Sequence, residues 1–475
     1  VMLLSLVLFL LGLQFLRLQW RSRRFPPGPI PFPIIGSIWW INFRADHGSL
    51  KKLAKAYGNI CTLWLGHKPI VVLYGFKAVK DGLTTNSEDV SGRLQTYLFN
   101  RFSSGKGILV SNGLIWKDQR RFGIATLRKL GMGNKGMERG IQAEARHLVE
   151  FFRSKDGRAV DPSFPIVHAV SNVICAVVFG HRFSLQDETF RRLMEAYNDC
   201  GFWEQLLLLR HLPGPIRKIE SCCNFIRSFI RQEIKSHRDR RAVDEPKDFI
   251  DFYLDQMEKT KNVPNSTYDE ENMLQSVFDL FLGGSETTAT TLRWALLYMV
   301  AYPDIQEKVH KELDAVLGSS RLICYKDRKN LPYTNAVIHE IQRYSNIVLI
   351  ALPRYTVKDT ELLGFPIPKD TIVLVNIDSV LSDPEKWETP DQFNPGHFLD
   401  KDGNFVHREA FLPFSIGHRA CMGELLARLE LFIIFCTLLQ AFTFTLPDGV
   451  NEVSTKFVFS STKKPPPHQI CAIPR

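Results

Sequence analysis

The spacing of apolar and polar residues divides the chain into an apolar start, a long helical middle and shorter strand-like stretches. Residues 1–16 are almost all apolar, and residues 60–73 alternate as two short strands around a turn. From about residue 78 to 350 the spacing is mostly helical. Residues 352–375 become strand-like again, and three prolines between 384 and 395 mark an irregular stretch. With no repeat and no clear boundary, the pattern predicts one mainly α-helical domain with small β-sheets.

The apolar start predicts a membrane anchor. Residues 1–16 are slightly short for a span, but residues 18–20 extend the run. Arginines follow it and none precedes it, which places the C-terminal side in the cytoplasm. A cleaved signal peptide is the alternative, but it would carry its charge before the apolar run and a small-residue cleavage site after it. Neither feature is present, so we expect an uncleaved transmembrane signal-anchor over residues 1–20.

A proline-rich segment follows the anchor. Five of the eight residues from Pro26 to Pro33 are prolines, a density that predicts a stiff extended segment rather than a helix. We therefore expect a basic, proline-rich hinge at 21–33 that leads into a folded domain over 34–475.

Charge and cysteine content narrow the class of partner. The formal net charge is +10, which suits nucleic acid, an anionic membrane surface or an acidic protein. No zinc finger, RNA-binding signature or long basic run occurs, so no nucleic-acid partner is expected. The nine cysteines include no Cys-x-x-Cys pair, which predicts reduced thiols facing the cytosol.

One stretch has the composition of a ligand loop. The chain carries Phe-x-x-Gly-x-Arg-x-Cys-x-Gly at Phe414, Gly417, Arg419, Cys421 and Gly423. Good helix formers follow at once, so Cys421 lies just before or at a helix start, where the helix dipole favours a thiolate. The glycines let the backbone turn tightly and approach a flat group. A buried structural cysteine is the usual alternative for a lone thiol. The five fixed positions favour an axial haem ligand instead.

This stretch resembles the haem-thiolate signature of the cytochrome P450 superfamily. Shorter motifs along the chain resemble the microsomal family two of that superfamily, the vertebrate type that oxidises xenobiotics, fatty acids or steroids. The resemblance runs from Pro26 to Glu430. It implies the cytochrome P450 fold, a single large triangular-prism domain, with haem b (iron protoporphyrin IX) bound through Cys421. Phe414 and Gly423 would then belong to the haem-binding loop. The C-terminal third is most similar to the branch that oxidises polyunsaturated fatty acids.

A proline-free helix predicted over about 271–301 contains Gly283-Gly284-Ser285-Glu286-Thr287-Thr288. Paired glycines and threonines that compete for carbonyl groups indicate a local opening of the helix. Glycines at a close helix crossing are an equally good explanation. The stretch resembles the family's oxygen-activation motif, which implies that Thr287 hydrogen-bonds dioxygen and that Glu286 belongs to a proton relay. Gly284 would leave room for oxygen, and Gly283 would widen the pocket slightly.

A second helical motif pairs Glu340 with Arg343, because residues three apart share a helix face. Alone it has little specificity, since residues 188–191 match the same pattern. Its surroundings resemble the family's structural Glu-x-x-Arg helix. The usual third partner is an arginine, and here His397 stands in its place. The exchange predicts a weaker or pH-sensitive third contact, because histidine can be neutral near pH 7.

A third motif places Trp116 and Arg120 on one helix face, where both can donate hydrogen bonds to a carboxylate. A cation–π surface pair is the commoner outcome of this spacing. The family resemblance implies instead that they bind the haem propionates. It assigns the same task to three further arginines, because arginine stays charged and forms paired hydrogen bonds with carboxylates: Arg93, Arg354 and Arg419.

The implied reaction inserts one oxygen atom of O₂ into an apolar substrate such as a fatty acid, steroid or xenobiotic, by hydroxylation or epoxidation. No flavin or nicotinamide site occurs in the sequence, so the electrons have to come from another protein. The resemblance implies NADPH–cytochrome P450 reductase as that donor, with cytochrome b5 as a second candidate. The resemblance places the protein in the endoplasmic reticulum membrane with its catalytic domain on the cytoplasmic face. It also implies a substrate pocket lined by apolar or small residues: Val110, Leu282, Gly283, Val348 and Leu352.

Two surfaces have competing explanations. A basic cluster is either a reductase-docking face or a solvated helix face: Lys117, Arg120, Arg121, Arg128 and Lys129. The apolar segment 202–215 either enters lipid or packs in the core. Two other function classes are compatible with a haem thiolate. An isomerase would need no reductase and could dispense with the Glu286–Thr287 pair, and a haem sensor would bind gas without consuming NADPH.

Overall fold

The computed structural model describes residues 2–41, 47–94, 97–132, 135–203, 213–240, 245–318, 321–459 and 462–475. They form two compact units. The first, called the sheet unit, consists of Val1–Leu94, Val348–Gln392 and His407–Cys421. The second, called the helical unit, consists of Gln95–Ile347, Phe393–Val406 and Met422–Arg475. Each is built from segments that are far apart in the sequence.

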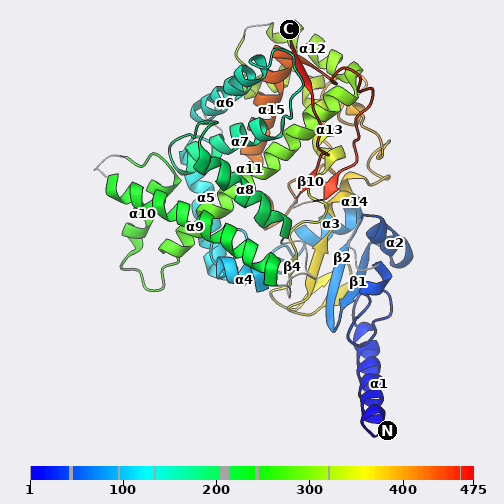
Figure 1. Ribbon diagram of the computed structural model, residues 1–475. Coiled ribbons are helices and arrows are strands. Elements are labelled where there is room, and N and C mark those ends of the chain that lie inside the picture. Colours follow the sequence, from blue (N-terminus) through cyan, green and yellow to red (C-terminus); the bar gives the residue numbers. More distant parts are fainter. Residues whose placement is uncertain are drawn as a thin grey trace. The chain divides into compact units, whose positions relative to one another are not determined.

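The sheet unit is built on one mixed five-stranded sheet (Figure 1). Its strands lie in the order β1 (Ile60–Leu65), β2 (Lys68–Leu73), β7 (Ile372–Val375), β4 (Arg354–Tyr355) and β3 (Gly92–Arg93). β2 and β7 are parallel, with Ile70 opposite Ile372, and the other neighbours are antiparallel. The expected hairpin over 60–73 is confirmed, because β1 and β2 pair directly. The smaller elements of the unit are η1 (Ile38–Ile41), α2 (His47–Tyr57), α3 (Gly75–Thr84), β5 (Thr360–Leu362), β6 (Phe365–Ile367) and α14 (Ile377–Leu381).

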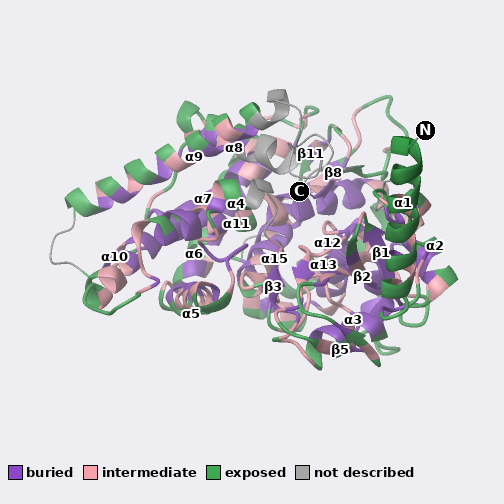
Figure 2. Ribbon diagram, turned by 90° about the horizontal axis from the view of Figure 1, so that it is seen from below, coloured by how far each residue is buried: buried purple, intermediate pink, exposed green. Residues whose placement is uncertain are grey.

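α1 (Met2–Ser22) is long and apolar enough to cross a membrane. Figure 2 shows that α1 is exposed over most of its length. Leu18 near its end is buried, and Arg21 Nη1 donates to the carbonyl oxygen of His67 in the β1–β2 turn at 3.1 Å. The helix is therefore attached to the sheet unit at its C-terminal end.

The proline-rich segment packs against β1. Thr62 N donates to the carbonyl oxygen of Pro27 at 2.9 Å. A Cβ atom on Gly28 would lie 1.9 Å from the Thr62 carbonyl oxygen, so only glycine fits there. The ring of Phe25 meets the ring of Trp64 edge-on, with centroids 5.4 Å apart. These contacts fix the entry of the chain into the sheet unit.

The helical unit contains most of the helices (Figure 1). They are α4 (Tyr97–Ser103), α5 (Gly113–Lys129), α6 (Lys135–Arg153), α7 (Ser163–Val178), α8 (Glu188–Trp203), α9 (Pro213–Arg240), α10 (Phe249–Thr260), α11 (Glu270–Ala301), α12 (Pro303–Leu317), η3 (Tyr325–Asn330), α13 (Pro332–Ser345), η4 (Pro395–Phe398) and α15 (Glu424–Ala441). Two short antiparallel pairs complete the unit: β8 (Phe442–Thr445) with β11 (Cys471–Pro474), and β9 (Val458–Phe459) with β10 (Lys463–Lys464).

α11 is the central helix of this unit. It packs against α7, α9, α13 and α15. Most of its length is buried, as is most of α15 (Figure 2). α15 is mainly apolar, whereas α11 buries several polar side chains among its apolar ones. Its start is set by the N-cap Asp269, whose side chain accepts a hydrogen bond from Asn272 N at 2.7 Å, followed by two glutamates in the first turn. The helix expected over about 271–301 is confirmed with its start one residue earlier.

A buried histidine joins the end of α9 to the start of α10. His237 Nε2 lies 2.9 Å from Asp248 Oδ2, and its Nδ1 lies 2.7 Å from the carbonyl oxygen of Glu233. Asp248 also caps α10 by accepting a hydrogen bond from Asp251 N. Burial alone would lower the pKa of His237, but the hydrogen bonds to Asp248 and Glu233 outweigh it and raise the pKa. Both ring nitrogens therefore donate in the protonated imidazolium form.

This contact predicts pH-dependent local stability. Because the pKa of His237 is higher in the folded state, its stabilisation is fully present below the ordinary value of 6.5 and is lost as pH rises through the folded-state pKa. We expect His237→Gln to raise hydrogen exchange at the α9–α10 junction about tenfold at about pH 5.5, the size of one hydrogen bond to a charged group. The excess should shrink at about pH 9.

The measurement is hydrogen–deuterium exchange by mass spectrometry, corrected for intrinsic exchange at each pH. His147→Gln is the matched control, because His147 is half exposed on α6 and its ion pair, with Glu150 at 3.5 Å, is a surface contact. An equal excess at both pH values would show that the His237 contact does not depend on its charge.

Candidate active site

The loop that carries Cys421 is closed by its own backbone. Cys421 N donates to the carbonyl oxygen of Phe414 at 3.0 Å, and Ala420 N donates to that of Gly417 at 3.0 Å. Gly417 has a φ of +79°, and a Cβ there would lie 2.1 Å from the carbonyl oxygen of Leu83 in α3. Glycine is therefore required at 417 by close packing on α3. Cys421 lies three residues before α15 and remains exposed, which excludes the buried structural cysteine.

The other described cysteines differ from Cys421 in their environment. Burial raises the pKa of Cys61 to about 12 and raises those of Cys175 and Cys436 well above the ordinary value. A thiol with such a raised pKa stays protonated at neutral pH and is a poor metal ligand. Cys421 combines exposure with a position just ahead of a helix N-terminus. Among the cysteines that the structure describes, it is the best suited to be a thiolate ligand.

Three buried arginines accompany Cys421 in the sheet unit. Arg93 in β3 donates to a backbone carbonyl oxygen ahead of β4 at 2.8 Å. Arg354 in β4 is 1% exposed and donates to Ser415 Oγ in the cysteine loop at 3.2 Å. Arg419 Nε donates to the carbonyl oxygen of Ser91 at 2.7 Å. Three guanidinium groups held in place by neutral oxygens create a strongly positive environment next to the thiol loop. This donor set fits haem, which offers iron to a thiolate and two carboxylates to arginines.

α5 places Trp116 and Arg120 together on one face. The guanidinium carbon of Arg120 lies 5.9 Å from the centre of the Trp116 ring, so the two side chains form the cation–π pair that was the alternative to propionate binding. Trp116 is 4% exposed, and the pair is therefore not a surface contact. A buried indole N–H and a half-buried guanidinium remain a reasonable donor set for carboxylates.

The two glycines of α11 have different surroundings. A Cβ on Gly284 would lie 2.4 Å from Ile174 Cδ1 of α7, whereas one on Gly283 would meet no atom within 4 Å. Gly284 therefore allows the close helix crossing with α7, which was the alternative explanation of the paired glycines. Gly283 is the glycine that faces open space, next to the half-buried Leu282.

α11 is continuous through this region, so the expected local opening of the helix is absent from these described residues. Thr287 Oγ1 instead donates to the carbonyl oxygen of Gly283, one turn earlier, at 2.7 Å. This side-chain bond is added to the helix without breaking it.

Glu286 is held by residues from the C-terminal segment. Its Oε1 accepts hydrogen bonds from Thr290 and Thr462 at 3.4 and 3.3 Å and forms an ion pair with Lys464 Nζ at 2.9 Å. Both charged side chains of the ion pair are 17% exposed. This partner was not predicted, because nothing in the local sequence indicates that a lysine 178 residues away is the counter-ion of Glu286.

Another group that the sequence analysis missed is Asp279, two turns before Thr287 on the same face of α11. Its Oδ2 accepts hydrogen bonds from the backbone N–H groups of Ile108 and Leu109 at 2.7 and 2.8 Å. Burial raises the pKa of Asp279 to about 6, against the lowering effect of these bonds and of Gln275. The sequence feature that could have identified Asp279 is that it is the single carboxylate in the otherwise apolar stretch from 277 to 282.

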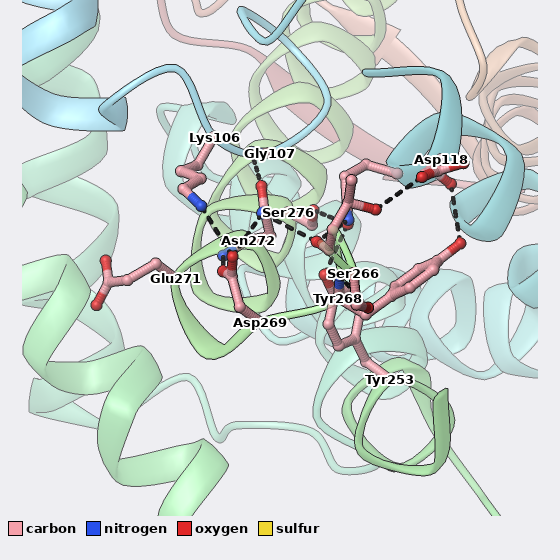
Figure 3. Close-up of polar contacts among 12 residues, drawn as sticks. Lys106, Gly107, Asp118, Tyr253, Ser266, Tyr268, Asp269, Glu271, Asn272 and Ser276 are labelled. Carbon is pink, nitrogen blue, oxygen red and sulfur yellow. Dashed lines mark hydrogen bonds and ion pairs between the residues drawn. The ribbon is translucent and has the colours of Figure 1, made fainter. Parts of the chain in front are cut away.

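The same loop is fixed by the first turns of α11 (Figure 3). Gly107 N donates to Asn272 Oδ1 at 3.1 Å, and Lys106 pairs with Asp269 at 2.8 Å. Together with Asp279, these bonds determine the position of Val110, which follows directly and is buried. Contacts with α11 thus fix the position of Val110.

The Glu340–Arg343 pair forms as predicted in α13. Arg343 donates through Nε and Nη2 to the two carboxylate oxygens of Glu340, each at 2.7 Å. His397 Nδ1 in η4 lies 3.2 Å from both oxygens, and Asn394 N donates to Glu340 Oε1 at 2.8 Å. All three side chains of the charged cluster are at most 1% exposed. His397 therefore occupies the predicted third position, and its contacts are longer than those of Arg343.

The remaining predicted residues are divided between the two units. Leu282, Gly283 and Val110 belong to the helical unit, whereas Val348 and Leu352 precede β4 in the sheet unit. The helical unit also contains Thr287, Glu286, Trp116, Arg120 and Gly423. The sheet unit contains Cys421, Phe414, Arg93, Arg354 and Arg419. The structure thus groups the thiol with three arginines, and the threonine with the glutamate. Most of the apolar segment 202–215 lies outside the described residues.

The basic cluster is exposed, as expected both for a reductase-docking face and for a solvated helix face. Lys117, Arg121, Arg128 and Lys129 all point to solvent from α5. Arg121 pairs with Asp118 at 3.0 Å, and Lys129 Nζ lies 5.4 Å from the ring centre of Phe252. Arg120 is only half-buried and turns toward Trp116, so it is separate from this exposed face.

Comparison with known proteins covers both units. The family model of cytochrome P450 matches residues 26–472. The chain is 42% identical over 484 residues to cytochrome P450 2J2 of Homo sapiens, covering 100% of this chain and 96% of that protein. It is 42% identical over 486 residues to cytochrome P450 2J3 of Rattus norvegicus, with the same coverage. It is 41% identical over 477 residues to cytochrome P450 2C8 of Homo sapiens, covering 98% of this chain and 97% of that protein. The chain therefore belongs to the cytochrome P450 family and is a haem-dependent monooxygenase, an oxidoreductase.

Proposed function

We propose that this monooxygenase binds haem b through the thiolate of Cys421 and oxidises apolar substrates with electrons from NADPH–cytochrome P450 reductase. The observation that carries the proposal is the exposed Cys421 loop with three buried arginines in the same unit. Arg93, Arg354 and Arg419, together with Trp116 and Arg120 of α5, would hold the haem propionates. Phe414 and Gly423 would shape the loop around the thiolate.

A haem held by a cysteine thiolate supplies the activation and cleavage of dioxygen. The protein then has to supply protons in a controlled way. Thr287 already donates its hydrogen to Gly283, so its oxygen can accept a hydrogen bond from a proton-bearing oxygen beside α11. Glu286 on the same helix would pass protons to that place. Gly283 would keep it open, because no atom occupies the position of its missing side chain.

The substrates we propose are fatty acids, steroids or xenobiotics, which would be hydroxylated or epoxidised. The support is the apolar character of Val110, Leu282, Val348 and Leu352. In the helical unit, the bonds of Asp279 to the loop before Val110 would keep that wall in position.

We place the protein in the endoplasmic reticulum membrane, anchored by α1, with the catalytic domain on the cytoplasmic face. Supporting this are the length and apolar character of α1 and the arginines that follow it. The exposed basic residues of α5 would attract an acidic reductase, and cytochrome b5 would be a second donor at the same face.

Two alternatives differ in what they require of Glu286 and Thr287. A haem-thiolate isomerase would need neither a reductase nor the pair, and a haem sensor would bind gas without consuming NADPH. Consumption of NADPH and O₂ in proportion to product distinguishes both from the monooxygenase.

Replacing the ligand tests the role of Cys421. We expect Cys421→His to lower product formation at least about 100-fold, because a neutral imidazole donates less electron density to iron than a thiolate. Product and NADPH consumption are measured with the reductase present. Cys471→Ser is the control for loss of a thiol elsewhere and should behave as the unmodified protein. Normal turnover by Cys421→His would contradict the assignment.

Replacing Thr287 tests proton delivery. We expect Thr287→Ala to consume NADPH at a near-normal rate but to lower product per NADPH about tenfold, with the electrons recovered in peroxide and water. Thr287→Ser should retain most of the coupling. Thr291→Ala is a matched control, because Thr291 makes the same type of bond to the carbonyl oxygen of Thr287, at 2.9 Å. Unchanged coupling in Thr287→Ala would argue against its role.

Removing charge from α5 tests electron transfer. We expect Arg128→Gln with Lys129→Gln to slow reduction by the reductase about fivefold at low salt, because attraction between exposed charges speeds association. Added salt should slow the unmodified protein more than the variant. Stopped-flow reduction provides the rates. Lys51→Gln with Lys52→Gln, two exposed lysines of α2, is the control. Equal rates for both double variants would place docking elsewhere.

A further inference from the structure

A cavity of about 320 Å³ lies in the sheet unit at the junction between α1 and β1 (Figure 1). The last residue of α1, Ser22, and the following Arg23 form one side of it, and the proline-rich segment forms another. Tyr57 at the end of α2 and Trp64 of β1 complete the lining. The volume is at the lower end of the range for small-molecule sites, so the cavity suits a compact chemical group.

Hydrogen bonds on both sides hold the walls of this cavity in place. Thr62 N donates to the carbonyl oxygen of Pro27 at 2.9 Å, which attaches the proline-rich segment to β1. Gln19 Nε2 donates to the carbonyl oxygen of Pro31 at 3.0 Å, which attaches the same segment to α1. The prolines restrict the backbone between these two bonds. The cavity is therefore preformed, and a ligand that enters it orders little of the protein.

The charge around the cavity is positive. Arg23 lines it, and among the residues that the structure describes Arg23 has no ion-pair or hydrogen-bond partner for its side chain. Arg21 Nη1 donates to the neutral carbonyl oxygen of His67, and the guanidinium carbon of Arg24 lies 4.0 Å from the ring centre of Trp20. No acidic residue belongs to the lining of the cavity. Three arginines within four residues thus favour an anion at this place.

The position of the cavity along the chain indicates where the anion comes from. The cavity begins at Ser22, where the apolar helix α1 ends. Trp20 is mostly exposed, and the arginines begin at Arg17, features that mark the boundary between membrane and water. Phosphate groups of phospholipids lie at that boundary, and basic residues next to a membrane helix attract anionic lipids.

The chemistry of the lining distinguishes between phospholipid headgroups. A guanidinium group forms paired hydrogen bonds with two oxygens of a phosphate. A choline headgroup would bring a second positive charge close to Arg21 and Arg24, whereas a headgroup with a net negative charge avoids this repulsion. Phe25 and the prolines offer apolar contacts to the glycerol and the first carbons of the acyl chains.

We propose that this cavity binds the headgroup of an anionic phospholipid of the cytoplasmic leaflet, with the phosphate paired to Arg23. The hydroxyl group of Tyr57 is a second donor in the lining. The proposal rests on the proposed anchoring of the protein in the membrane by α1. The bound lipid would attach the sheet unit to the bilayer surface at a point outside the membrane helix.

The test counts the lipid that the haem-loaded full chain retains. The protein is reconstituted in vesicles of phosphatidylcholine and phosphatidylserine, released with mild detergent and examined by native mass spectrometry. We expect one retained phosphatidylserine molecule. Arg23→Gln should lower the retained fraction about tenfold, because it removes charge-assisted hydrogen bonds to the phosphate. Arg23→Lys should recover only part of it, because an ammonium group cannot form the paired contact.

Arg17→Gln is the matched control, because it removes an exposed arginine of α1 that does not line the cavity. It should change the retained fraction at most about twofold, since exposed charges are screened by salt. An excess of inorganic phosphate should not displace the lipid, because it lacks the apolar contacts. Retention of both lipids in proportion to the vesicle composition, equal losses in Arg23→Gln and Arg17→Gln, or displacement by inorganic phosphate would overturn the proposal.

Extraction of the vesicles with alkaline carbonate separates this proposal from the membrane anchor on which it rests. If the protein stays with the vesicles but retention of phosphatidylserine does not depend on Arg23, only the headgroup site fails. If carbonate releases the protein, anchoring by α1 fails as well.

Discussion

The central constraint on this protein is that a thiol must remain reachable and able to ionise while the chain around it is packed. The loop before α15 meets this constraint with its own backbone bonds, from Cys421 to Phe414 and from Ala420 to Gly417. Gly417 lies against the backbone of α3, and this contact fixes the position of the loop. The buried arginines of the sheet unit add positive charge, which favours the thiolate and an anionic ligand. The other predicted haem-binding contacts depend on this arrangement.

α11 has to combine close packing with polar chemistry. On one side Gly284 brings the helix against Ile174 of α7, and on another Gly283 leaves open space. Polar groups occur along it only where another element receives them, as Asp279 does for the loop at 108–109 and Glu286 for β10. The buried Glu340–Arg343–His397 cluster follows the same rule, because each charge there has a partner.

The sequence predicted local structure and long motifs well. The bounds of α11, the β1–β2 hairpin and the Glu340–Arg343 pair all follow from spacing within one element. It predicted less well where distant segments meet. Nothing in the local pattern indicates that Gly284 faces Ile174, that Lys464 pairs with Glu286, or that the hinge packs on Thr62. Such contacts depend on how elements pack, and the periodicity of each element does not encode its neighbour.

The most direct test of thiolate ligation is the absorption spectrum of the dithionite-reduced, haem-loaded protein with and without carbon monoxide. A thiolate ligand pushes electron density onto the iron and shifts the Soret band of the carbon monoxide complex strongly to the red. The unmodified protein is expected to show that shift. A Soret band at the position usual for histidine-ligated haem would contradict the role of Cys421, and the absence of any haem band would contradict the assignment of the whole site.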